Sequence, residues 1–207
     1  MIVWLVFEQF LIRSCTMLWL DSVRRQFSTA NLLRSCHHNL FQTGQIADVA
    51  IIIGTNTDEG TAVFLGPRLT PLNNDDDVFD YVKGLGAGLD NNTVSTVMKL
   101  YPDDPALGCP FQTGPERFES QGFQYKRGAA IAGDYFMHAG KRFYAHDHSL
   151  RSEKPIYTYR FDQAPWNMKE PSIMIVPPVF VTHYSEVYSI SFRPKTIPDA
   201  CAANTKL

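Results

Sequence analysis

The feature that most constrains the fold of this 207-residue chain is a short apolar run, VAIIIG, at residues 49–54. Its three consecutive isoleucines are stiff at χ1 and favour extended backbone, and the run is too short for an ordinary helix. An apolar run without polar alternation is typical of a strand that is buried on both faces of a sheet. The run therefore predicts a central strand, which needs neighbouring strands and covering helices.

The segments after this run predict helices and a second strand. Two polar stretches, NNDDDVFDYVKG and NNTVSTVMKLY, place Asn/Asp caps before short helical patterns. Apolar residues at near-helical spacing between residues 117 and 148 predict one long helix or two. Residues 154–161, KPIYTYRF, alternate aromatic and polar side chains, as half-buried strands do. Strands interleaved with long helices indicate an α/β architecture.

Composition and charge exclude several classes of protein. Hydrophobic residues make up 44% of the chain and charged residues 19%, so a packed core is expected and global disorder is not. The net charge of −2 provides no excess of basic residues for nucleic acid, so no nucleic-acid partner is expected.

The first twenty residues, MIVWLVFEQFLIRSCTMLWL, are apolar but are interrupted by Glu8 and Arg13. A transmembrane helix needs roughly 18 or more apolar residues without charge, so no specific membrane insertion is expected. A secretory signal would carry a basic start, an unbroken apolar core and a small-residue cleavage site, and this segment lacks all three. Residues 1–31 are interpreted as an amphipathic or core helix, with a degenerate signal or anchor as the alternative.

Two carboxylates, Asp58 and Glu59, follow the apolar run in the turn NTDEGT. A carboxylate at the carboxyl end of a strand can orient a histidine in a catalytic triad, in the chain order nucleophile, acid, histidine. His183 lies later in the chain and fits this order. The alternative is structural: Thr57 would cap a helix whose dipole the two acids complement, and His183 would be a buried polar group.

These segments, in this order, resemble the type-B carboxylesterases and lipases, the family that includes the cholinesterases, and especially its fungal members. The matching stretches are VAIIIGTNTDEGTAVF, VMKLYPDDPALGCPF, FQYKRGAAIAGDYFMHAGKRFYA, PIYTYRFDQAPWN and PPVFVTHYSEV. They cover most of residues 47–187. The resemblance implies a partial α/β-hydrolase fold, namely the C-terminal part of its mixed, mostly parallel sheet with flanking helices.

The same resemblance implies the roles of four residues. Glu59 corresponds to the catalytic acid of the family and His183 to its catalytic base. Glu186 corresponds to the supporting acidic residue three positions after the base, and Asp58 then looks like a turn residue. Members of the family hydrolyse carboxylic esters through an acyl-enzyme without a metal or an organic cofactor, so neither is expected here.

The resemblance also implies a division of the chain. Residues 32–190 match the C-terminal part of a carboxylesterase domain, whereas residues 1–31 and 191–207 match nothing in it. Tyr184 follows the histidine at a position where many members carry glycine. Full-length members are usually secreted, but this sequence shows no convincing signal peptide, and its localisation is left open.

The nucleophile of the family is not found in this sequence. The family's serine stands in a G-x-S-x-G turn, where only small residues fit. No serine here has glycine both two positions before and two positions after it, and Ser120, with Phe118 and Gly122, comes nearest. The chain alone is therefore expected to be inactive and to act on a carboxylic ester only if an N-terminal half completes it. The alternatives are a non-catalytic binding protein with a hydrolase-like fold and a truncated product without an independent role.

Other side chains with chemical potential are weaker candidates. The histidines of His37-His38 and of His146–His148 would point in different directions on a helix, so no metal site is expected there. Four cysteines, at positions 15, 36, 109 and 201, permit two disulfides without requiring any. Cys109 is expected to be a buried or disulfide-linked thiol and not a nucleophile.

Overall fold

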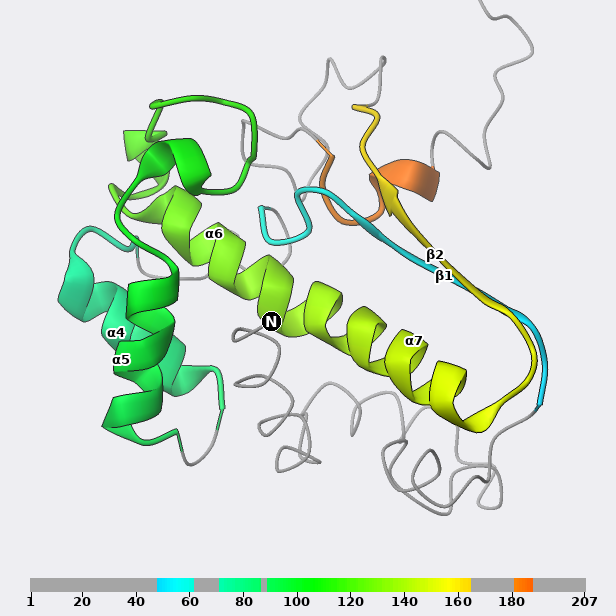
Figure 1. Ribbon diagram of the computed structural model, residues 1–207. Coiled ribbons are helices and arrows are strands. Elements are labelled where there is room, and N and C mark those ends of the chain that lie inside the picture. Colours follow the sequence, from blue (N-terminus) through cyan, green and yellow to red (C-terminus); the bar gives the residue numbers. More distant parts are fainter. Residues whose placement is uncertain (1–47, 62–70, 87–88, 165–180, 188–207) are drawn as a thin grey trace, which may run out of the picture.

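The computed structural model describes residues 48–61, 71–86, 89–164 and 181–187 (Figure 1). Within these residues the chain forms two parallel strands and several helices, so the predicted α/β class is confirmed as a mixed α/β arrangement. The expectations for residues 1–31 and 191–207 lie outside the described residues, as do those for the cysteines at positions 15, 36 and 201.

The two strands pair in parallel, and their carboxyl ends therefore lie at the same edge. β1 (Ile51–Asn56) and β2 (Ile156–Phe161) begin with Ile51 opposite Ile156 and end with Asn56 opposite Phe161. Both strands occur where the sequence predicted strands. A further parallel bridge joins Asp58 to Thr182, so the segment 181–187 (orange in Figure 1) lies beside this edge.

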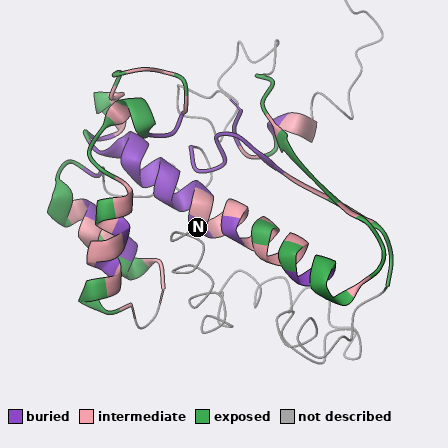
Figure 2. Ribbon diagram, viewed as in Figure 1, coloured by how far each residue is buried: buried purple, intermediate pink, exposed green. Residues whose placement is uncertain are grey.

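The prediction that the first strand is buried on both faces is wrong for its first half. Ile52 is 73% exposed, and Tyr157, which pairs with it, is 60% exposed. Because α7 (Ala139–Arg151) contacts both strands, one face is covered, while no described helix covers Ile52 and Tyr157. Burial increases toward the carboxyl end, where Thr55 and Asn56 are buried (Figure 2).

Two short helices begin where the predicted caps stand. α4 (Asp75–Gly84) is capped by Asn74, whose side chain accepts from the backbone N–H of Asp77 at 3.0 Å. The Asp77 carboxylate in turn accepts from the backbone N–H of Asn74, which completes a capping box. α5 (Asn91–Leu100) is capped by Asp90. Local sequence therefore determines where both helices start.

A continuous helical segment follows in the middle of the chain (Figure 1). It consists of α6 (Tyr125–Gly133), a π-helical turn (Asp134–His138) and α7. The prediction of one long helix or two is confirmed, but the helix does not begin near residue 117. Residues Glu119–Gln121 form a 3-10 turn, and Gly122 follows with φ of 111°, which interrupts helical backbone before Tyr125.

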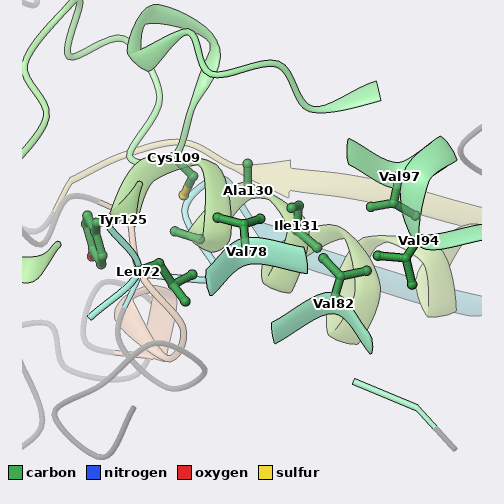
Figure 3. Close-up of a cluster of buried hydrophobic side chains, with 10 residues drawn as sticks. Leu72, Val78, Val82, Val94, Val97, Cys109, Tyr125, Ala130 and Ile131 are labelled. Atoms are coloured by element: carbon green, nitrogen blue, oxygen red, sulfur yellow. The ribbon is translucent and has the colours of Figure 1, made fainter. Parts of the chain in front are cut away.

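The hydrophobic core lies where α4 and α5 pack against α6 (Figure 3). Its buried members are Leu72, Val78, Val82, Val94, Val97, Cys109, Tyr125, Ala129, Ala130 and Ile131. α6 is buried along its whole length (Figure 2). This helix also supports the turn after β1, because the Tyr125 hydroxyl donates to the carbonyl of Thr61 at 2.9 Å. The acid-bearing turn is thus anchored on the best-buried helix of the described chain.

The turn approaches α6 so closely at Gly60 that no side chain fits between them. A Cβ atom on Gly60 would lie 2.0 Å from the carbonyl oxygen of Ala129. We expect Gly60→Ala to lower the free energy of unfolding by about 2 kcal/mol, because the turn or the helix must move. The control is Gly140→Ala in α7, where nothing lies within 4 Å of such an atom.

We expect Gly140→Ala to raise the free energy of unfolding by about 1 kcal/mol, because alanine is the better helix former. Urea denaturation of the two variants measures both changes. Effects of the same sign and size would contradict the close contact between the turn and α6.

Candidate active site

The candidate site is built on the tight turn that follows β1. The backbone N–H of Thr61 donates to the carbonyl of Asp58 at 3.1 Å, and the Thr61 hydroxyl donates to the same oxygen at 2.8 Å. Glu59 lies inside this turn and is 3% exposed. Its Oε1 accepts from the backbone N–H of Asn56 at 2.6 Å. The turn therefore holds the carboxylate in one direction through hydrogen bonds within its own segment.

The second oxygen of Glu59 binds His183. Its Oε2 lies 2.6 Å from Nδ1 of the histidine, across 124 positions of the chain. Because an ionised carboxylate only accepts, Nδ1 carries the hydrogen, and Nε2 is the acceptor atom of the neutral ring. The His183 side chain is 23% exposed and that of Glu59 only 3%. The contact predicted from the sequence is present, with a buried acid behind a partly accessible imidazole.

Parallel pairing explains why residues so far apart in sequence meet. The backbone N–H of Asp58 donates to the carbonyl of Val181 at 2.9 Å. The hydroxyl oxygens of Thr61 and Thr182 lie 3.0 Å apart, within hydrogen-bonding distance. These bonds continue the parallel pairing past the end of β1 and fix the segment before His183 against the turn.

Asn56 links the segment of Glu59 to the segment of His183, although it was not among the site residues predicted from the sequence. Its backbone N–H holds Glu59, while its side-chain amide donates to the carbonyl of Thr182 at 2.7 Å and to Oε2 of Glu186. Glu186, which was predicted to support the histidine, is therefore connected to the site through Asn56. The signal available in the sequence was a polar residue at the end of an apolar strand.

The Asp58 carboxylate connects two other segments to the turn. Its Oδ1 accepts from the backbone N–H of Phe111 at 2.9 Å and lies 3.6 Å from Sγ of Cys109. Its Oδ2 accepts from the backbone N–H of Val181 at 3.0 Å, and the residue is 2% exposed. Asp58 is thus a turn residue that also holds the histidine segment in place.

Cys109 is a buried free thiol in the structure. Burial raises the pKa of this thiol well above its ordinary value, and the neighbouring carboxylate of Asp58 raises it further. A thiol that stays protonated is a poor nucleophile. The prediction of a buried thiol is confirmed, and the disulfide alternative is not realised.

Thr57 does not cap a helix in the structure. Its hydroxyl donates to Oδ1 of Asp162 at 2.6 Å, and the carbonyl oxygen of Phe161 lies 3.1 Å from the same hydroxyl oxygen. A capping hydroxyl would accept from a backbone N–H of the following helix. Thr57 instead binds the end of β2, so the interpretation of residues 57–59 as a helix start is wrong.

A second histidine, His138, lies near the pair and was not selected from the sequence. Its Nδ1 is 3.0 Å from Oγ1 of Thr55, and the same hydroxyl accepts from Nζ of Lys141 at 2.8 Å. Burial lowers the pKa of His138, against the opposing effect of Asp134. The hydroxyl of Thr55 can therefore donate to a neutral ring while it accepts from the lysine.

No metal site or membrane span is found in the described part of the chain. No group of three or more histidine, cysteine, aspartate or glutamate side chains in it could hold a metal ion. His148 is fully buried with Nε2 3.1 Å from the carbonyl oxygen of Val49, and His37-His38 lies outside the described residues. None of the described helices is long and apolar enough to cross a membrane.

A buried carboxylate that orients a partly exposed imidazole is the arrangement of the acid and base in a catalytic triad. Comparison with known proteins finds similarity to fungal lipases. The chain is 36% identical over 107 residues to Lipase 4 of Diutina rugosa and 30% identical over 115 residues to Lipase 2 of Geotrichum candidum. It is 30% identical over 105 residues to Lipase 2 of Diutina rugosa.

These matches cover 51%, 54% and 51% of this chain, but only 18%, 19% and 18% of the three lipases. No family model matches the chain. The similarity to several fungal lipases confirms the resemblance found in the sequence. The chain is thus similar to fungal lipases over about half of its own length, and it spans less than a fifth of the length of the curated relatives it matches.

Proposed function

We propose that this chain carries the acid and the base of a carboxylic ester hydrolase, with Glu59 as the acid and His183 as the base. The 2.6 Å hydrogen bond between them is the observation that carries the proposal. Its support is the similarity of the chain to fungal lipases. We further propose that residues 32–190 are the C-terminal part of an α/β-hydrolase domain, with residues 1–31 and 191–207 outside it.

The geometry suits a proton transfer to Nε2 of His183, the ring nitrogen that does not bind Glu59. A serine hydroxyl loses its proton to Nε2 of His183 as its oxygen bonds to the ester carbonyl carbon. The imidazolium that forms is stabilised by Glu59, whose buried position keeps water from weakening the interaction. His183 then returns the proton to the leaving alcohol as the ester C–O bond breaks. The proposed reaction uses no metal and no organic cofactor.

The serine for this reaction comes from outside these 207 residues in our proposal. None of the serines in the chain has glycine on both sides at the required spacing. A polypeptide that completes the site must supply the serine and the oxyanion-hole donors. The substrate of the completed site is then a carboxylic ester. The missing serine equally motivates the second candidate, a binding protein with a hydrolase-like fold and no catalysis.

Sequencing of the complete transcript distinguishes these candidates. We expect an in-frame upstream segment with a G-x-S-x-G motif, and we expect the longer polypeptide to be labelled by a fluorophosphonate probe at that serine. Labelling should disappear when the motif serine or His183 is replaced by alanine. A mature product with no such segment, which binds esters without cleaving them, would contradict the hydrolase proposal and favour the binding protein.

A further inference from the structure

Tyr184, the residue directly after His183, has a backbone conformation that is unfavourable for its side chain. Its φ is 71°, in the left-handed region. In that region the Cβ atom of an L-residue is crowded by its own backbone, so a bulky residue there is an outlier. Glycine adopts the same conformation without strain. The chain therefore carries local strain directly beside the proposed base.

Hydrogen bonds on both sides fix this strained turn. The backbone N–H of Ser185 donates to the carbonyl of Thr182 at 3.1 Å, and that of Val187 donates to the carbonyl of Tyr184 at 3.2 Å. The Thr182 carbonyl also accepts from the Asn56 side chain at 2.7 Å. These bonds involve backbone groups in the turn, so glycine at position 184 would satisfy them equally well. What tyrosine adds is its ring.

The ring of Tyr184 lies edge-on against the imidazole of His183. The two ring centroids are 4.8 Å apart, and the ring planes are inclined at 84°. This is the favourable T-shaped arrangement of two aromatic rings. Tyr184 is nevertheless 64% exposed, so burial in a core does not explain why a large ring occupies a strained position. The contact of its ring with the imidazole provides an explanation.

The imidazole needs a restraint of this kind. The last torsion of a histidine side chain has broad, shallow minima, so the ring turns easily unless its surroundings hold it. The hydrogen bond from Nδ1 to Glu59 fixes one atom of the ring. The ring of Tyr184, packed nearly at right angles to the imidazole, limits rotation of the imidazole about this last torsion. It therefore keeps Nδ1 directed at the carboxylate of Glu59.

We propose that Tyr184 is a positioning residue that holds the imidazole of His183 in the orientation required by Glu59. This inference rests on the proposed function, because it assigns Tyr184 a role through the proposed base. The strain in its backbone is the structural cost of placing an aromatic ring at that point of the turn.

The test is nuclear magnetic resonance of the 207-residue chain labelled with ¹⁵N in its histidines. The measured quantity is the rate at which the Nδ1 hydrogen of His183 exchanges with water, with the signal assigned by its loss in His183→Gln. We expect Tyr184→Gly to raise this rate about tenfold. Loss of an edge-on ring contact makes local opening of the imidazole more frequent by about that factor. Tyr184→Phe keeps the ring and should keep the original rate.

Further variants separate positioning from general stability. Tyr184→Asn also tolerates the left-handed backbone and lacks the ring, so it should behave as Tyr184→Gly does. The thermal midpoint of Tyr184→Gly should not fall below that of the unmodified chain, because the backbone strain is relieved. Tyr157→Thr removes another exposed tyrosine, on β2, and should leave the exchange rate unchanged.

An exchange rate in Tyr184→Gly equal to that of the unmodified chain would overturn the proposal. Glu59→Gln distinguishes this failure from failure of the proposed function. If the hydrogen-bonded Nδ1 signal is lost in Glu59→Gln but is unaffected in Tyr184→Gly, only the positioning role fails. If the signal survives unchanged in Glu59→Gln, the acid–base pair itself is absent in solution, and both proposals fail.

Discussion

The 207-residue chain is expected to hydrolyse short-chain p-nitrophenyl esters no faster than its His183→Ala variant. Its acid and base are in contact, but no serine of the chain has the G-x-S-x-G surroundings of the family's nucleophile. Removal of the nucleophile from a serine-hydrolase triad lowers kcat by a factor on the order of 10⁶. A correctly oriented histidine cannot compensate, because it only moves a proton and forms no bond to the ester carbon.

A fluorophosphonate probe tests this expectation independently of turnover. Intact-mass measurement should show no adduct on the chain, while a fungal lipase treated in parallel should gain one. Stoichiometric labelling of a serine in this chain, abolished by His183→Ala, would contradict the prediction. Such a result would mean that a serine outside the G-x-S-x-G motif reaches Nε2 of His183.

Asp58→Ala is expected to lower the free energy of unfolding by about 4 kcal/mol, since two backbone N–H groups, one of a buried and one of a partly buried residue, lose their acceptor at a cost of roughly 1–3 kcal/mol each. The two donors are the N–H groups of Phe111 and Val181, at 2.9 and 3.0 Å from the carboxylate. The loss should be large because these bonds join three segments, of which one leads to His183. Urea denaturation measures this loss of stability. An unchanged m-value would show that the substitution changed stability alone.

The control for this prediction is Asp162→Ala. Asp162 also accepts a hydrogen bond from the turn after β1, from the hydroxyl of Thr57 at 2.6 Å, but it is exposed. Water can replace an exposed acceptor, so we expect a loss of about 0.5 kcal/mol or less. An Asp58→Ala variant that is no less stable than Asp162→Ala would show that the buried carboxylate does not hold the three segments together.

Several elements of the fold follow from short-range sequence signals. The β-branched residues of β1, the alternation in β2 and the caps Asn74 and Asp90 each specify local backbone through side-chain sterics or one hydrogen bond. The contact between Glu59 and His183 was also anticipated, but from the order of segments shared with a family and not from any local rule. Their catalytic roles stay a proposal.

Other features could not be read from local sequence. The pattern of β1 indicated burial on both faces, yet Ile52 is exposed, because burial depends on which segments cover a strand and not on the strand itself. Thr57 stood in a favourable position to cap a helix, but the end of β2 offered its hydroxyl the acceptors Phe161 and Asp162. In both cases a distant segment decided the outcome.

The sequence by itself determined the types of the elements, the position of the acid-bearing turn at a strand's end and the lack of a G-x-S-x-G serine, since each depends on neighbouring residues alone. Only the tertiary structure decided that Asn56 links Glu59 to the histidine segment, that Asp58 joins three segments, and that Tyr184 lies edge-on against His183. The physical reason is that hydrogen bonds and ring contacts form between groups a few ångströms apart in space. The parallel pairing of β1 with β2 and the bridge from Asp58 to Thr182 bring residues about 120 positions apart within that range.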